Sequence, residues 1–229
     1  MLLEALEWCL TPCPWASRRS GFLAAQIAIR HRAIRCRKAW RPHLESCKIF
    51  TAESIGSAPP TGNALILGSG HLRDFDLPFL RRRFRRIVLA DAVHPLEIQI
   101  LARFSKRKVQ LATEDLAVPS PQIQRLAKQS EWTISCCLLS QLPLGPNSRG
   151  ATETLSAHLA LLQSSQSAIL ITDTAKRTIG TPDWHSVIEN HQLPDPDKTW
   201  TWLIAPPGET GKDGEERLIA AALFNYPPS

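Results

Sequence analysis

From residue 64 onward, short runs of apolar residues alternate along the chain with segments of helix length. Runs that are apolar at successive positions are typical of parallel strands that are covered on both faces. We predict five such strands, over 64–67, 87–90, 109–112, 132–138 and 168–172. Two further apolar segments, 200–205 and 217–224, flank a turn-rich stretch that is too short for a crossover helix. The pattern therefore predicts an α/β fold with a doubly wound, mostly parallel seven-stranded sheet that ends in an antiparallel hairpin.

The first fifty residues follow a helical pattern instead. The turn residues 11–14 separate a short helix from a longer one. On a helical wheel of the longer segment, six apolar side chains form one stripe that we expect to face the core: Phe22, Ala25, Ile29, Ala33, Cys36 and Trp40. We predict an N-terminal helical extension over residues 1–53, a Gly-, Ser- and Pro-containing linker over 54–63, and one Rossmann-like domain over 64–229.

Composition limits the class of protein. The 229 residues are enough for one α/β domain with an appendage, and 43% hydrophobic with 21% charged residues is typical of a soluble globular chain. No apolar run approaches the roughly 18 residues that span a bilayer, and Glu4 and Glu7 stand where a secretory signal has cations. The six cysteines show no Cys-x-x-Cys spacing. We expect a cytoplasmic protein with reduced, structural thiols and no membrane partner.

The net charge of +6 is concentrated near the N-terminus. Residues 1–50 hold nine Lys and Arg against three Glu, so the remainder of the chain is neutral. Two further basic runs, 81–86 and 106–108, fall before strands, at the sheet edge where we expect no ligand. A solvated rim is the favoured interpretation of these runs, and a nucleic-acid track is the alternative.

A ligand site is predicted at the opposite edge, where the parallel strands end. Gly68-Ser69-Gly70 directly follows the first strand, and glycines there let the backbone approach a ligand, with a helix N-terminus expected near Asp74. Asp91 ends the second strand, 23 residues beyond Gly68, where an acid can bind both hydroxyls of a ribose. We expect its side chain to lie in an open crevice. Glu114 and Asp115 follow the third strand. Ligands of doubly wound sheets bind at this edge, where the strand order reverses.

In these residues the chain resembles the class I, Rossmann-like S-adenosylmethionine-dependent methyltransferase family, over roughly residues 60–225. The resemblance implies that the cofactor S-adenosylmethionine is bound by Gly68, Ser69, Gly70, Asp91, Glu114 and Asp115. Residues 137–143 resemble the family's segment beside methionine and substrate, and the terminal hairpin resembles its usual sheet ending. The implied activity is in-line methyl transfer, which requires no obligatory base, with the N-terminal helices forming part of the acceptor pocket.

Two positions depart from the family pattern and keep alternatives open. Ile66 stands where an acid is frequent, and Leu72 stands where a third glycine is common. One alternative is a non-catalytic module of the same fold that binds RNA or an acidic protein through its basic N-terminus. Another is an aminoalkyl-transferring synthase with a similar glycine loop. A nicotinamide-binding domain is disfavoured because Arg73 occupies the last position of G-x-G-x-x-G.

The acceptor is less well defined. No Asn-Pro-Pro-Tyr-like signature follows the fourth strand, so a small molecule is favoured over a nucleic-acid base. Ser140 and Gln141 either position a substrate or cap a turn. Asp173 ends the fifth strand and is a candidate proton acceptor or a turn former, with Trp184 and His185 as substrate contacts. His71 and His94 either touch the cofactor or are ordinary loop histidines. No metal site is predicted, because the histidines have no ligand spacing.

Overall fold

The computed structural model describes residues 2–56, 62–188, 193–209 and 211–225. Its α-helices are α1 (Leu2–Leu10), α2 (Trp15–Arg19), α3 (Phe22–Arg35), α4 (Arg37–Ile55), α5 (Leu77–Arg83), α6 (Leu96–Phe104), α7 (Pro121–Gln129) and α8 (Ala151–Gln163). A short 3₁₀ helix, η1, covers Leu139–Leu144. Among these helices none combines the length and apolar character that a bilayer span requires.

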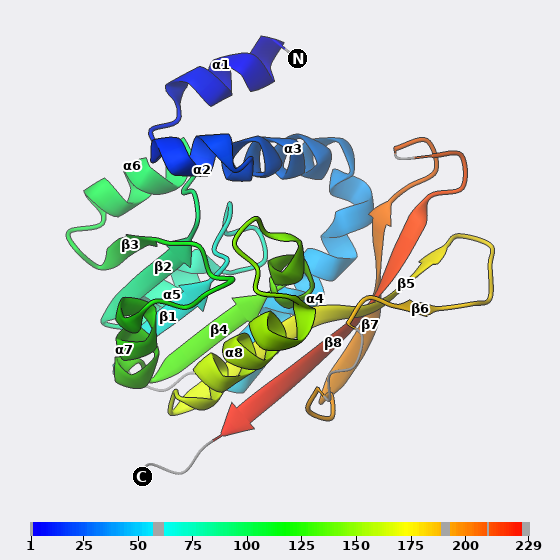
Figure 1. Cartoon of the computed structure of the whole chain (residues 1–229). Helices are drawn as coiled ribbons and strands as arrows, with labels where there is room; N and C mark the ends of the chain where they lie inside the picture. The colour runs from blue at the N-terminus through cyan, green and yellow to red at the C-terminus, as the bar shows by residue number, and fades with distance from the viewer. Residues whose placement is uncertain (1, 57–61, 189–192, 210, 226–229) are drawn as a thin grey trace.

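The strands form one sheet, shown in Figure 1. They are β1 (Asn63–Leu67), β2 (Arg86–Asp91), β3 (Val109–Thr113), β4 (Trp132–Cys136), β5 (Ser167–Thr178), β6 (His185–Ser186), β7 (Lys198–Ala205) and β8 (Glu215–Asn225). Their order is β3-β2-β1-β4-β5-β8-β7, and β6 pairs with the outer part of β5. Neighbours from β3 to β5 are parallel, whereas β8 is antiparallel to both β5 and β7. The predicted fold class is confirmed, and the order reverses between β1 and β4.

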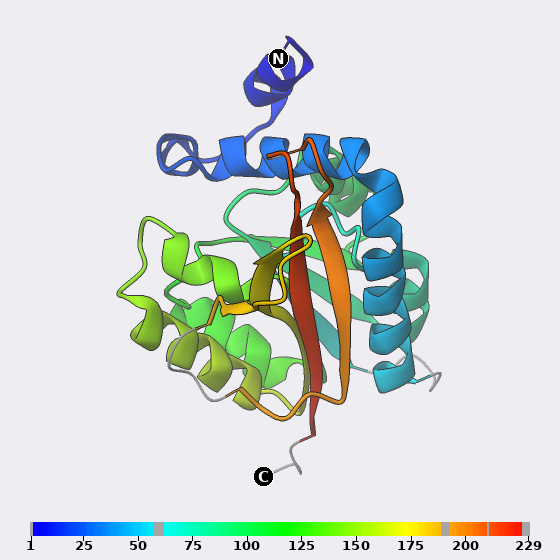
Figure 2. The same cartoon turned by 90° about the vertical axis from the view of Figure 1, so that its right-hand side faces the viewer.

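Helices cover both faces of the sheet because successive strand residues point to opposite sides. In β1, Ala64 and Ile66 pack into a core with α4, α5 and α6, whereas Leu65 and Leu67 pack into a second core with α7 and α8. Figures 1 and 2 show this three-layer arrangement, in which α4 lies along one face while α3 crosses one end of the sheet. The parallel strands are therefore apolar on both faces, as their sequences require.

The long N-terminal helix bends where one continuous helix was expected. Cys36 separates α3 from α4, and its dihedrals (φ −90°, ψ 13°) fall outside the helical range. The predicted stripe is correct near the bend, where Ala33 at the end of α3, Cys36 itself and Trp40 of α4 are buried. Earlier in α3 it is wrong, because Ala25 and Ile29 are exposed and the helix instead buries Leu23 and Ile27. A single helical wheel cannot predict the buried positions of both helices, because α3 and α4 differ in the direction of the face that packs.

The predicted boundaries shift at three places. Helix α4 continues to Ile55 and β1 begins at Asn63, so the ends of the expected linker 54–63 belong to regular elements, and 57–61 lie outside the described residues. The fourth strand ends at Cys136, two residues before the predicted end, because Cys137 takes a left-handed conformation (φ +51°). Strand β5 runs six residues past Thr172, paired along that length with β8.

Candidate functional site

The turn after β1 is held against β2 by its own backbone. The N–H groups of Gly68 and Ser69 both donate to the carbonyl of Ala90, at 2.9 and 3.4 Å. Gly68 has φ +67° and Gly70 has φ +45°, in the left-handed region that glycine tolerates. A Cβ on Gly68 would lie 3.0 Å from Leu138, whereas a Cβ on Gly70 would meet nothing nearer than 3.9 Å. The space beside Gly70 is therefore the part of the turn that a ligand can approach.

Leu72 explains one departure from the family pattern. It stands where a third glycine is common, and its φ is +56°, so this position does require a left-handed backbone. A non-glycine residue there costs roughly 1–2 kcal/mol. The side chain is buried in the core that includes Phe75 and Leu80. Hydrophobic burial offsets the backbone strain, and the turn keeps its shape without the glycine.

The helix after this turn begins later than predicted. We expected its N-terminus near Asp74, but α5 starts at Leu77, and Asp76 is its N-cap, with its carboxylate accepting the N–H of Phe79 at 3.0 Å. The intervening residues form turns, in part because Pro78 favours the first turn of a helix. The free N–H groups of α5 are consequently not part of the glycine turn.

Asp91 joins the glycine turn to the other strand ends. Its Oδ2 accepts the N–H of Gly70 at 2.7 Å and the Gln26 amide at 3.3 Å, and its carbonyl accepts the N–H of Glu114 at 2.9 Å. The expectation of an open crevice is wrong here, because Asp91 is only 9% exposed beneath α3. Burial raises the pKa of the Asp91 carboxyl, and it lowers the pKa of His94, whose Nε2 lies 3.1 Å from the Ala112 carbonyl.

The two acids after β3 have different contacts. The backbone N–H of Glu114 donates to the Asp91 carbonyl, and Glu114 is partly exposed. The Asp115 carboxylate accepts the N–H of Ala117 at 2.9 Å and the side-chain amide of Asn147 at 2.7 Å. Asp115 therefore shapes the loop after β3, and each of its oxygens keeps capacity for a further donor.

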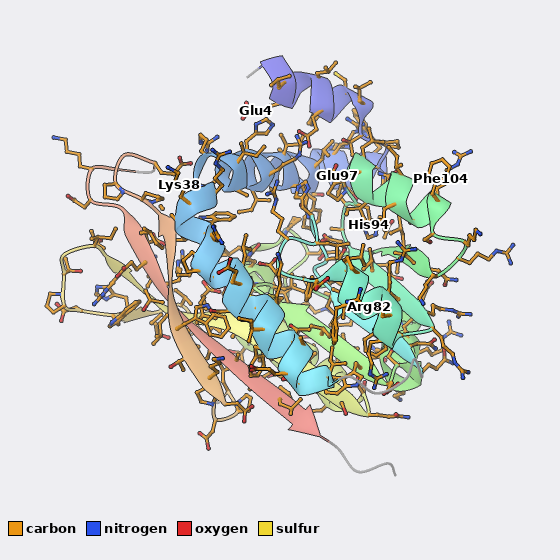
Figure 3. The ribbon with its side chains drawn as sticks, turned by 180° about the vertical axis from the view of Figure 1, so that it is seen from behind. Glu4, Lys38, Arg82, His94, Glu97 and Phe104 are labelled. Atoms are coloured by element: carbon orange, nitrogen blue, oxygen red, sulfur yellow. The ribbon has the colours of Figure 1, made fainter. Side chains whose placement is uncertain are left out.

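Helix α3 covers this constellation. His71 lies between α3 and α6, with Nε2 at 3.2 Å from the Gln26 carbonyl and Nδ1 at 2.7 Å from Glu97. In Figure 3, the labelled His94 and Glu97 lie next to α3, and Arg82 lies farther from it on α5. Gln26 was not predicted as a site residue, because its one sequence signal is a polar position in an otherwise apolar helix face.

Three buried polar atoms around the glycine turn lack a hydrogen-bond partner among the described residues: Gln26 Oε1, Ser69 Oγ and His94 Nδ1. Gln26 Oε1 lies beside Gly70, and His94 interacts with Asp91. Buried polar atoms in native proteins are normally paired with protein or solvent groups. This edge can therefore accept hydrogen bonds from a polar ligand, as well as donate to one through Ser69.

The ends of β4 and β5 are joined by side chains rather than left open. The Ser140 hydroxyl donates to Asp173, and Arg217 of β8 pairs with the same carboxylate at 2.9 Å. Gln141 donates to the Cys137 carbonyl at 2.6 Å, which is the turn-capping alternative. Through these two contacts Asp173 orders the Ser140 and Arg217 side chains at the ends of β4 and β5.

The two predicted aromatic contacts lie farther out along β5. The guanidinium of Arg177 lies over the Trp184 ring, with its Cζ atom 4.5 Å from the ring centre. His185 is exposed in β6, opposite Lys176. The structure therefore does not bring Trp184 and His185 onto the Ser140–Asp173 pair.

A group of thiols that the sequence did not predict as a site lies close to the same edge. Cys47 of α4 meets Cys136 and Cys137, with His43 and Asp74 beside them. Hydrogen bonds from the two neighbouring thiols lower the pKa of Cys47 to about 6, and burial raises the pKa of Asp74 to about 6. The sequence shows the i, i+4 spacing of His43 and Cys47 and the adjacent cysteines 136 and 137. It does not show that Cys47 and Cys136, 89 residues apart, are in contact.

Two surface hollows lie outside the constellation. One, of about 770 Å³, runs between α7 and α8. The other, of about 580 Å³, is basic and is lined by Asn63, Arg81, Arg85, Arg86, Ser105, Lys106, Arg107 and Lys108. These residues surround the starts of β1, β2 and β3, so both basic runs lie at the edge away from the glycine turn, as predicted.

No protein-family profile matches this sequence, and no curated protein sequence matches it. Solved structures do match its fold. The 1,6-didemethyltoxoflavin-N1-methyltransferase of Burkholderia thailandensis was solved with bound 1,6-didemethyltoxoflavin and S-adenosylhomocysteine. It aligns with a TM-score of 0.54 at 14% identity, over 92% of this chain and 88% of that one. The CurJ carbon methyltransferase aligns with a TM-score of 0.40 at 14% identity, over 76% and 52% of the two chains. An Aquifex aeolicus S-adenosylmethionine-dependent methyltransferase aligns with a TM-score of 0.35 at 12% identity, over 74% and 86%.

The Burkholderia likeness extends over nearly the whole of both chains, and at 14% identity it establishes the fold alone. The strand order with its terminal antiparallel pair agrees with this assignment. This chain has the class I, Rossmann-like fold of the S-adenosylmethionine-dependent methyltransferases.

Proposed function

We propose that this protein is an S-adenosylmethionine-dependent methyltransferase. The observation that carries the proposal is the hydrogen bond from Gly70 to Asp91, which joins the glycine turn of β1 to the acid that ends β2. Both lie on the β1 side of the point where the strand order reverses, which is where doubly wound sheets bind their ligands. The Burkholderia enzyme of the same fold was solved with S-adenosylhomocysteine.

The polar atoms present suit this cofactor. Asp91 can accept from ribose hydroxyls, and the unpartnered Gln26 Oε1 can accept from a hydroxyl or an ammonium group. Ser69 Oγ can donate to a carboxylate or accept from an amine. The free space beside Gly70 allows close backbone approach. Glu114 and Asp115 follow the next strand and belong to the residues that the family resemblance assigns to the cofactor.

When bound, the cofactor supplies a methyl group on a positively charged sulfur, which is electrophilic without further activation. The residues of this chain would then bind the cofactor and the acceptor, orient them relative to each other and exclude water. Helix α3 covers Asp91 and Gly70, and it would shield the reacting groups from solvent. Ser140, ordered by Asp173, stands at the end of β4 and would orient the acceptor.

The acceptor we propose is a small molecule. No base-binding signature follows β4, and four of the nine Lys and Arg residues in the N-terminal helices, Arg30, Arg32, Arg35 and Arg41, are paired with acids of this chain. Arg30 pairs with Glu7 at 2.9 Å, and Arg32 and Arg35 pair with Glu209 at 3.6 and 2.5 Å. Paired cations contribute less to phosphate binding, which disfavours RNA capture by this segment. Six free thiols are in keeping with a cytoplasmic location.

Thermal unfolding with added ligands tests the cofactor. At a hundredfold excess over its dissociation constant, S-adenosylhomocysteine should stabilise the fold by about 2.7 kcal/mol, which raises the melting temperature by roughly 5–10 °C. NAD should cause no comparable shift. A larger shift with NAD would contradict the cofactor assignment.

Product analysis tests the reaction itself. With cofactor labelled on the methyl group, methyltransferase activity places the label on an acceptor drawn from a small-molecule extract. Label transferred from the aminoalkyl portion instead would identify the synthase alternative. Cofactor binding without transfer of either label, to small molecules or to RNA, would identify a non-catalytic module.

A further inference from the structure

Three cysteines from distant parts of the chain meet beside the end of β4. The Sγ atom of Cys136 lies 3.9 Å from that of Cys47, on α4, and 3.9 Å from that of Cys137. Cys47 and Cys136 are buried, and Cys137 is partly buried. We call these three residues, with His43 and Asp74, the thiol cluster. None of them is among the residues to which cofactor binding is assigned above, although Cys137 begins the segment 137–143.

The backbone is strained where it brings two of the thiols together. Neighbouring residues of a strand point to opposite faces, so Cys136 and Cys137 would be separated if β4 continued. Instead Cys137 adopts φ +51°, a left-handed conformation that costs roughly 1–2 kcal/mol for a residue with a side chain. This conformation places both sulfurs on one side, within contact of α4. Strain of this kind persists where a packed or functional arrangement requires it.

His43 completes the surroundings of the sulfurs. Its Nε2 lies 3.6 Å from Cys47 Sγ, 3.7 Å from Cys137 Sγ and 3.7 Å from Asp74 Oδ1. Trp200 donates its indole N–H to Nδ1 at 3.0 Å, and Trp202 stacks on the ring at 4.0 Å between centres. Because Nδ1 accepts, the neutral ring carries its proton on Nε2, which faces the sulfurs and the carboxylate. His43 is thus a fixed donor to a thiolate.

The sulfur separations agree with shared coordination of one ion. Tetrahedral zinc bonds to sulfur at about 2.3 Å, which sets neighbouring sulfurs about 3.8 Å apart. The Sγ atom of Cys136 lies 3.9 Å from the Sγ atoms of both Cys47 and Cys137.

We propose that Cys47, Cys136 and Cys137 bind a thiophilic divalent metal ion of the zinc class. Asp74 is the candidate fourth ligand, because its carboxylate lies within 4.8 Å of the Cys47 sulfur and of a His43 ring nitrogen. The His43 N–H supports the thiolates from outside the coordination sphere, as outer partners of metal ligands commonly do. With four protein ligands the site is structural, and it fastens α4 to the carboxyl end of β4.

Cobalt provides the test, because tetrahedral Co²⁺ bound by thiolates has sulfur-to-metal charge-transfer absorption. The reduced full-length protein, stripped of metal, is titrated with Co²⁺ and then with Zn²⁺, in the absence of S-adenosylmethionine. One equivalent of Co²⁺ should develop thiolate charge-transfer bands, and Zn²⁺ should displace it. Since no cofactor is present, the outcome is independent of the proposed methyl transfer.

Two variants and a control make the test specific. Cys137→Gly removes a ligand at a position where glycine relieves backbone strain, and Cys47→Ala removes another with a small side chain. Each should weaken Co²⁺ binding by more than about 100-fold while its circular dichroism stays native. Cys36→Ala, a buried thiol outside the cluster, should bind as the wild type does.

Stability gives a second measurement. Zn²⁺ should raise the melting temperature of the wild type and of Cys36→Ala, and it should not raise that of folded Cys137→Gly. The proposal is wrong if the wild type shows no thiolate charge transfer with Co²⁺. It is equally wrong if folded Cys137→Gly and Cys47→Ala bind the ion with wild-type affinity.

Discussion

Asp91 has a structural role in addition to the ribose-binding role that we propose for it. Its position at the end of β2 suits ribose binding, yet the same carboxylate accepts the N–H of Gly70 and the amide of Gln26 beneath α3. Burial raises the pKa of Asp91 because it destabilises the carboxylate, and hydrogen-bond donors of a bound ligand would offset part of that cost. A residue that sequence places at an exposed strand end is in fact part of the packing between α3 and the sheet.

Two substitutions at Asp91 separate these roles. Asp91→Ala should weaken S-adenosylhomocysteine binding by about 10- to 100-fold, because charge-assisted hydrogen bonds contribute about 1.5–3 kcal/mol and water recovers part of this. It should also lower the unfolding free energy by about 1–3 kcal/mol, because the Gly70 N–H loses its acceptor. Asp91→Asn keeps an acceptor and should retain more of that stability. Calorimetric titration and melting curves measure both. Unchanged affinity in both variants would exclude Asp91 from the cofactor site.

Among the elements, α8 is attached to the sheet through an uncharged histidine. His158 is fully buried, and its Nε2 lies 2.9 Å from Ser135 Oγ of β4. Burial lowers the pKa of His158 to about 4. The folded protein therefore keeps this ring neutral at pH values where the unfolded chain, with an ordinary histidine pKa near 6.5, binds a proton.

This pKa difference predicts that the unfolding free energy falls at acid pH because of His158, at the contact between α8 and β4. Between pH 6.5 and 4 the unfolded state binds more protons at this position, so the contribution of His158 is complete above pH 6.5 and falls as the pH drops toward 4. The unfolding free energy of the wild type relative to His158→Leu should fall by about 3 kcal/mol between pH 7 and pH 4. Urea unfolding at several pH values measures the difference. His185→Leu, at an exposed position, is the control and should leave the difference from wild type constant.

For the whole molecule, the N-terminal helices divide into two parts. Helices α1 and α2 contact mainly α3, and no side chain of α2 is buried. Helix α4 belongs to the sheet, because Cys47, Phe50 and Ile55 lie in the core with β1 and β4, and Trp40 donates its indole N–H to Ile204 of β7 at 2.9 Å. The predicted extension over residues 1–53 thus contains a helix that supplies part of the main core.

Truncation tests this division. A chain that begins at residue 21 should fold, with a modest loss of stability. A chain that begins at residue 51 should not fold, because it loses Trp40, Cys47 and most of α4. Each large buried side chain contributes about 2–5 kcal/mol against a total stability of about 5–15 kcal/mol. Circular dichroism and melting curves distinguish the two outcomes. A cooperative unfolding transition in the chain from residue 51 would contradict this view of α4.

The pattern of apolar residues was sufficient to predict the class of fold, because parallel strands buried on both faces and a terminal antiparallel pair leave periodic signals within short stretches of chain. It also placed Gly68, Asp91 and Glu114 at one sheet edge, since strand ends are local features and parallel strands share an edge. The boundaries at Cys136 and Leu77 were less accurate, because strain at Cys137 and capping by Asp76 depend on what each segment packs against.

Only the tertiary structure decided which distant residues meet. The cover of Asp91 by Gln26 depends on the bend at Cys36, which turns α3 across the sheet and leaves α4 along its face. The thiol cluster depends on the packing of α4 against β4 and β7, which brings Cys47 to Cys136 and His43 to Trp200. Helical and strand periods report which side of an element is buried, but they carry no information about its partner. Side-chain contacts over long separations follow from how the layers are stacked, and they exist only in the folded chain.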